Sequence, residues 1–73
     1  MTIRDAINAA YQLHLEWIGP IRPGTSYDLN RIHASMLQES RWNRSNPARV
    51  TRANASETRG KLILLGKVRK ALA

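Results

Sequence analysis

The stretch TIRDAINAAYQLHLEW, residues 2–17, decides the fold class, because its apolar residues recur every three or four positions. Thr2 suits a helix N-cap, and Asp5 follows three residues later, near the positive end of the helix dipole. The glycine and proline at positions 19 and 20 then end the segment, since proline cannot continue a helix. The segment is predicted to be an α-helix whose apolar face consists of Ile3, Ala6, Ile7, Ala10, Leu13 and Trp17.

A second helix is predicted after the short, stiff loop GPIRPGTS, residues 19–26. It is expected to start at Thr25 or Ser26, with Asp28 in its first turn. Its apolar face would consist of Leu29, Ile32, Met36 and Leu37.

The rest of the chain also has a helical pattern, interrupted by loop-forming residues. Pro47 suits the first turn of a short third helix running to about Ala53. Asn54 and Glu57 have the spacing of a capping box, which predicts the start of a last helix. The apolar face of that helix would consist of Leu64, Leu65, Val68, Ala71 and Leu72.

The predicted fold class is all-α, a small single domain of three to four short helices spanning residues 1–73. The core is thin, because phenylalanine is absent and the chain is near the lower size limit for folding without staples. Gly60 and Gly66 weaken the last helix, since each costs up to about 1 kcal/mol relative to alanine. The basic C-terminal segment, residues 54–73, is therefore the part of the chain in which partial disorder of the free protein is considered.

Positive charge is concentrated in the second half of the chain. Residues 1–40 form a near-neutral helical part, with three arginines against four carboxylates. Residues 41–73 form a basic binding part, with nine lysines and arginines against Glu57 alone. Such asymmetry, in a chain of net charge +7, predicts a polyanionic or acidic partner.

The composition argues against several classes of protein. Without cysteine there can be no disulfide or thiolate metal site, and the longest apolar run, Leu62–Leu65, is far too short to span a bilayer. The N-terminus lacks the apolar region of a signal peptide. His14 and His33 lie on different predicted helices without a suitably spaced acid, and His14 is expected to be a packing residue. We therefore expect a non-enzymatic protein with no catalytic residue, metal or cofactor, and no membrane partner.

The strongest functional signal is RWNRSNPARVTR, residues 41–52, with four arginines, one tryptophan and no acid. Arginine binds phosphate or carboxylate through two parallel hydrogen bonds, and a tryptophan face stacks on a base or a guanidinium group. The predicted partner-binding residues are Arg41, Trp42, Arg44, Arg49 and Arg52. Lys61, Lys67, Arg69 and Lys70 are expected to support them electrostatically.

Three kinds of partner fit this segment. A helix-turn-helix could enter the DNA major groove, although residues 40–47 exceed the usual turn length. RNA could be held by phosphate contacts and stacking. A protein groove is favoured by Leu62 and Ile63, which fall outside the apolar face of the last helix, so that some of this apolar surface is expected to be exposed in a free monomer. Trp42 is either a core residue or an interface anchor.

The chain resembles a family of small bacteriophage regulators that bind host RNA polymerase, inhibit initiation and promote antitermination. The resemblance covers TIRDAINAAYQLHLEW, then YDLNRIHASMLQESRWNRSNPARV at residues 27–50, and the basic, apolar C-terminal segment. It implies a monomer in the host bacterial cytoplasm that docks on the large polymerase subunits near the RNA exit channel, close to nascent RNA or DNA. There it would displace the promoter-specificity factor and hinder terminator hairpins. A phage repressor or excisionase that binds specific DNA sequences is the alternative.

Overall fold

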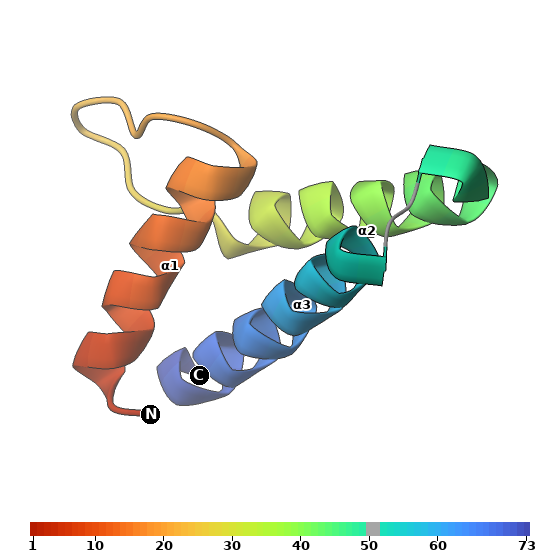
Figure 1. Ribbon diagram of the computed structural model, residues 1–73. Coiled ribbons are helices and arrows are strands. Elements are labelled where there is room, and N and C mark those ends of the chain that lie inside the picture. Colours follow the sequence, from red (N-terminus) through yellow and green to blue (C-terminus); the bar gives the residue numbers. More distant parts are fainter. Residues whose placement is uncertain (50–51) are drawn as a thin grey trace.

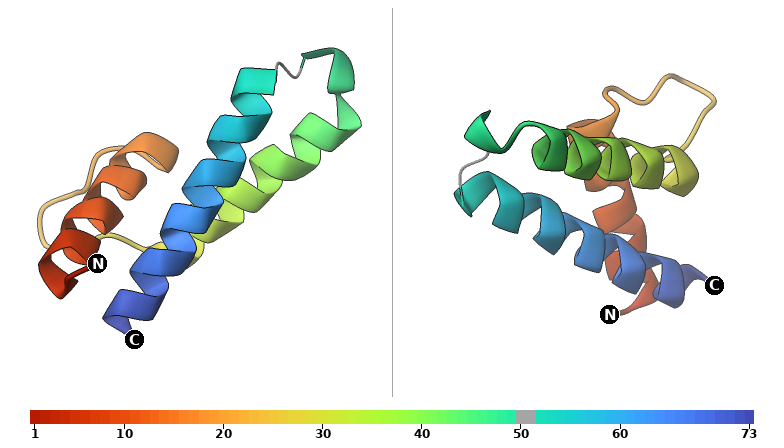
Figure 2. Two further views of the ribbon diagram at one scale, coloured as in Figure 1. Left: turned by 60° about the horizontal axis from the view of Figure 1, so that its bottom comes forward. Right: turned by 90° about the vertical axis from the view of Figure 1, so that its right-hand side faces the viewer.

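The computed structural model describes residues 1–49 and 52–73, in which three α-helices and one 3-10 turn follow one another (Figure 1). They are α1 (Ile3–Trp17), α2 (Leu29–Ser45), η1 (Pro47–Arg49) and α3 (Arg52–Leu72). Helix α3 runs back along α2, so the two helices are roughly antiparallel. Both chain ends lie far from η1 (Figures 1 and 2). The described residues form no strand, so the predicted all-α class is confirmed.

The core lies where the three helices meet, and α3 is the helix that the other two share. Helix α3 packs against both α1 and α2, more extensively than these two pack against each other. Core positions recur at three- and four-residue spacing, as one buried face per helix requires. The buried apolar residues are Ala6, Ala10, Leu13, Ile32, Met36, Leu65 and Val68.

Helix α1 starts and ends as predicted. The Thr2 side chain accepts a hydrogen bond from the backbone N–H of Asp5 at 3.0 Å, which satisfies one free donor of the first turn. The helix ends before Gly19, whose φ of +135° lies outside the range of other residues. Ile3, predicted on the apolar face, is 64% exposed, because it is the first helical residue and lies beyond the reach of the core.

The predicted start of the second helix was wrong by three or four residues. The N-cap is Asp28, whose Oδ1 atom accepts a hydrogen bond from the backbone N–H of Arg31 at 3.1 Å. Thr25 and Ser26 bond elsewhere: the Thr25 hydroxyl donates to the carbonyl of Arg22, and the Ser26 hydroxyl pairs with that of Tyr11. The loop therefore extends to residue 28.

The prediction for the last two helices was also wrong in part. A three-residue 3-10 turn, Pro47–Arg49, replaces the expected short helix to Ala53, and residues 50–51 of that prediction lie outside the described residues. Helix α3 begins at Arg52, so Asn54 is inside its first turn and is not a cap. From there the basic segment forms one helix of 21 residues, despite its two glycines.

The apolar surface of α3 is wider than the predicted face. Leu62 packs against the core and is only partly exposed, so only part of the apolar surface outside the predicted face is open. The reason is that α3 contacts two helices, so it buries residues over a broad arc. Ile63 is 56% exposed, as predicted.

Candidate functional site: the arginine turn

The C-terminal end of α2 is held in place by a side-chain cap. The backbone N–H and the Nδ2 atom of Asn46 both donate to the carbonyl of Trp42, at 3.0 and 3.1 Å. The Trp42 carbonyl thus accepts two hydrogen bonds at a helix end, where backbone carbonyls lack partners within the helix. Pro47 follows and starts the 3-10 turn, so the chain reverses at a defined point.

This reversal presents basic and aromatic side chains at one end of the molecule. We name it the arginine turn, defined as residues 41–52, the end of α2, η1 and the first residue of α3 (Figure 2). Arg41 and Arg44 are exposed and form no ion pair within the described residues. Trp42 is 51% exposed, which resolves the choice left open by the sequence: Trp42 is a surface residue, and the core is closed without it.

The remaining two predicted anchors are placed by their backbones alone. Arg49 is the last residue of η1, and Arg52 is the first residue of α3. Both therefore belong to the arginine turn, while their side chains lie outside the described part of the structure.

Two of the four supporting basic residues are engaged within the protein. The Nζ atom of Lys61 forms an ion pair with Glu16 at 3.0 Å, which joins α3 to α1. The Nη2 atom of Arg69 donates to the Asn30 side chain at 3.0 Å and to the carbonyl of Leu29 at 3.4 Å. These contacts hold α3 against the other helices, so both side chains have a structural role.

Lys67 and Lys70 are exposed but lie far from the arginine turn. At 1.5 Å per residue, they are roughly 22 to 27 Å along α3 from Arg52. The predicted site residues are therefore spread along α3: the anchors lie near its first turn, Lys61 lies in its middle, and Lys67, Arg69 and Lys70 lie near its C-terminal end. The arginine turn holds all five predicted anchors.

The structure adds Arg59 to these anchors. Arg59 is exposed and, together with Arg44, borders a hollow of about 320 Å³ between α2 and α3, next to Leu62 and Ala55. Arg59 was missing from the prediction, although it follows Arg52 by seven residues, which places both on one face of a helix. That spacing was the signal in the sequence.

The side chains that could take part in catalysis or metal binding are dispersed over the described residues. His14 is buried and His33 is half-buried, on separate helices. In residues 1–49 and 52–73, no group of three His, Cys, Asp or Glu side chains is arranged to hold a metal ion. None of the described helices is both long and apolar enough to cross a bilayer.

Comparisons of the chain with protein-family models, with curated proteins and with solved structures gave no match.

Proposed function

We propose that this protein is a non-enzymatic bacteriophage regulator that binds the large subunits of bacterial RNA polymerase in the host cytoplasm. It acts as a monomer, inhibits initiation and promotes antitermination. The arginine turn is the binding surface, with nascent RNA or DNA close by. The identity of the partner follows from the resemblance of residues 2–17 and 27–50 to such regulators.

One observation carries the choice of a protein partner. Arg44 and Arg59 border a hollow that Leu62 and Ala55 line, and Trp42 is exposed in the same turn of the chain. An apolar hollow between two cations fits a partner side chain next to a carboxylate, because apolar burial and charge pairing are then satisfied together. Arginine and tryptophan are also the residues most enriched at the energetic centres of protein interfaces.

The helix-turn-helix alternative has less support. It requires a short recognition helix after the turn, and that position holds a 3-10 turn of three residues. Helix α3 runs back along α2 and contributes two of its buried residues, Leu65 and Val68, to the core. A protein partner is therefore favoured over DNA, and the experiment below distinguishes the two.

The test is co-elution of the purified protein with RNA polymerase at moderate salt. Co-elution is expected for the unaltered chain, and Arg41→Gln combined with Arg44→Gln should reduce it strongly, since both guanidinium groups are lost. The matched control is Arg4→Gln together with Arg22→Gln, which removes the same charge from exposed residues elsewhere. Tight retention of duplex DNA, falling steeply with salt and without polymerase binding, would overturn the proposal.

A further inference from the structure

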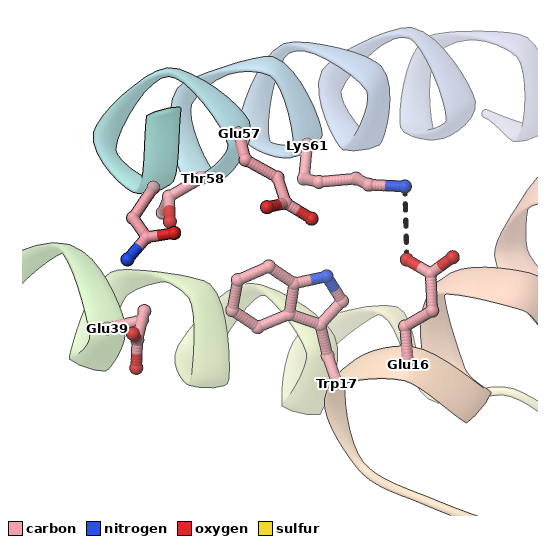
Figure 3. A pocket seen from close by; sticks show the side chains of 7 residues that line it. Glu16, Trp17, Glu39, Glu57, Thr58 and Lys61 are labelled. Carbon is pink, nitrogen blue, oxygen red and sulfur yellow. Dashed lines mark ion pairs between the residues drawn. The ribbon is translucent and has the colours of Figure 1, made fainter. Parts of the chain in front are cut away.

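A hollow of about 410 Å³ opens where α1, α2 and α3 meet, and the ring of Trp17 lies in it (Figure 3). The Glu57 carboxylate reaches toward the ring from α3, and the Lys61–Glu16 ion pair lies beside the ring, between α3 and α1. The Glu39 side chain, on α2, is directed away from the ring. The residues that line the hollow are Glu16, Trp17, Glu39, Asn54, Glu57, Thr58 and Lys61.

The hollow is acidic in a protein that is otherwise basic. It is lined by three of the chain's five carboxylates and by one lysine, whereas the whole chain has a net charge of +7. Glu16 is paired with Lys61, but Glu39 and Glu57 form no ion pair within the described residues. The carboxylates of Glu39 and Glu57 are thus available to a cation, and Glu57 is the one that reaches toward the Trp17 ring.

Thr58 is a separate indication that the hollow binds a ligand. Thr58 is only 8% exposed, and its hydroxyl forms no hydrogen bond in the part of the chain that the structure describes. In that same part, every fully buried side-chain nitrogen or oxygen has a partner. The Thr58 hydroxyl is therefore reached from outside, and it is an unused polar group in a nearly buried side chain that lines both this hollow and the one beside Arg44 and Arg59.

We propose that this hollow receives an arginine side chain of the protein partner. A guanidinium group is planar and weakly hydrated, so it stacks on the Trp17 ring and donates to the Glu57 carboxylate. The Thr58 hydroxyl can accept a further hydrogen bond from it. Glu39 adds negative potential without direct contact.

Other occupants fit less well. Nucleic acid is repelled by the carboxylates, because its backbone is itself negatively charged. A second copy of this chain carries the same charge of +7, so its approach is opposed over long range. A metal ion lacks a suitable group of ligands among the described residues.

This inference deepens the proposed function and rests on it for the statement that the partner is a protein. The arginine turn binds acidic groups of the partner, whereas the hollow binds a basic one. Together they select a partner surface of mixed charge, which discriminates against a plain polyanion. Thr58 lines both hollows, but the charged residues differ, so substitutions at Glu57 and at Arg44 test the two surfaces separately.

The first experiment uses a small probe and the full chain. The ¹⁵N-labelled protein is titrated with Nα-acetyl-arginine methylamide, and its amide and indole signals are followed by NMR. Saturable shifts are expected at the Trp17 indole and the Thr58 amide, with little change at the Trp42 indole. The citrulline analogue has the same shape without the charge, so its binding should be weaker; equal binding of both probes would overturn the proposal.

Matched variants test the carboxylate. Glu57→Gln should weaken binding of the arginine probe roughly two- to fivefold, the range for an exposed ion pair. Asp5→Asn removes one negative charge from α1 outside the hollow and should leave the binding constant unchanged. An equal loss in both variants would show that net charge alone attracts the probe and would refute the site.

Co-elution with polymerase then separates the two proposals. If polymerase does not co-elute but the probe binds at Trp17, the proposed function fails and the cation site remains. If polymerase co-elutes equally with the unaltered chain and with Glu57→Gln, and no probe shift occurs, the cation site fails and the proposed function remains. A concentration-dependent dimer in sedimentation, abolished by Glu57→Gln, would identify a second copy as the occupant and overturn the inference.

Discussion

The Nδ1 atom of His14 accepts a hydrogen bond from the backbone N–H of Asp28 at a distance of 3.1 Å. The Asp28 carboxylate caps the N-terminus of α2. The hydrogen bond from Asp28 to His14 therefore connects the last turn of α1 to the N-cap of α2. The His14 side chain is only 6% exposed. The expectation that His14 is a packing residue is thereby confirmed. Its role is more specific than packing, because it connects α1 to the end of the loop that leads into α2.

Replacing His14 by alanine should lower the free energy of unfolding by about 1 to 3 kcal/mol, since the Asp28 N–H is left without its partner. His14→Asn is the matched control, because its side-chain oxygen can take the place of Nδ1, and it should recover part of the loss. Urea unfolding followed by circular dichroism measures both. Equal destabilisation by the two variants would show that the ring's packing, and not its hydrogen bond, is what matters.

Two glycines with the same open surroundings should respond to alanine in opposite ways. A Cβ atom added at Gly66 or at Gly24 meets no atom within 4 Å, so neither substitution is opposed by packing. Gly66 is inside α3, and Gly66→Ala should stabilise the protein by about 0.5 to 1 kcal/mol. Gly24 has a φ of +81°, so Gly24→Ala should destabilise it by about 1 to 2 kcal/mol.

Thermal unfolding followed by circular dichroism can resolve this difference, because about 1 kcal/mol shifts the Tm of so small a domain by roughly 4 to 8 °C. A lower Tm for Gly66→Ala would mean that α3 needs flexibility at this position or contacts a neighbour there.

The two tryptophans should separate stability from binding. Trp42→Ala should change the free energy of unfolding by no more than about 0.5 kcal/mol, because the side chain is exposed. Trp17→Ala should cost about 1 to 3 kcal/mol, less than a fully buried tryptophan, since Trp17 packs only partly against the core. Urea unfolding measures both losses. Under the proposed function, Trp42→Ala should still weaken co-elution with polymerase, and a large loss of stability in Trp42→Ala would contradict its place on the surface.

Arg59 was not among the predicted anchors, and its place beside Arg44 can be tested by substitution. Arg59→Gln should weaken polymerase binding as much as Arg44→Gln does, roughly five- to tenfold, because both border the same hollow. Binding constants from titration of labelled protein measure the effect, with Arg4→Gln as the control of equal charge. Unchanged binding in Arg59→Gln alone would restrict the site to α2 and the turn.

Much of the fold could be read from local sequence patterns. The cap at Thr2 and the apolar spacing of Ala6, Ala10 and Leu13 depend on neighbours within one or two helical turns, so they were predicted correctly. The start of α2 was misplaced because Thr25, Ser26 and Asp28 are all good caps. Long-range contacts decide among them: Ser26 bonds to Tyr11, and Asp28 bonds to His14.

The candidate site shows the same limit. The concentration of arginines at residues 41–52 was visible in the sequence, because its members are close to one another along the chain. The engagement of Lys61 with Glu16 and of Arg69 with Asn30 depends on how α3 packs, so no local pattern indicated it. For the same reason, nothing in the sequence indicated that Glu39 and Glu57 line one hollow with Trp17.

The sharing of α3 between the other two helices has a mechanical consequence. Leu65 and Val68 are buried in the one core to which α1 and α2 both contribute, and Lys61 and Arg69 attach α3 to each of them. Moving α3 away from one neighbour would therefore also uncover the core that it shares with the other. Under the proposed function, the arginine turn and the acidic hollow would be presented together along α3, and a partner would have to match both surfaces at once.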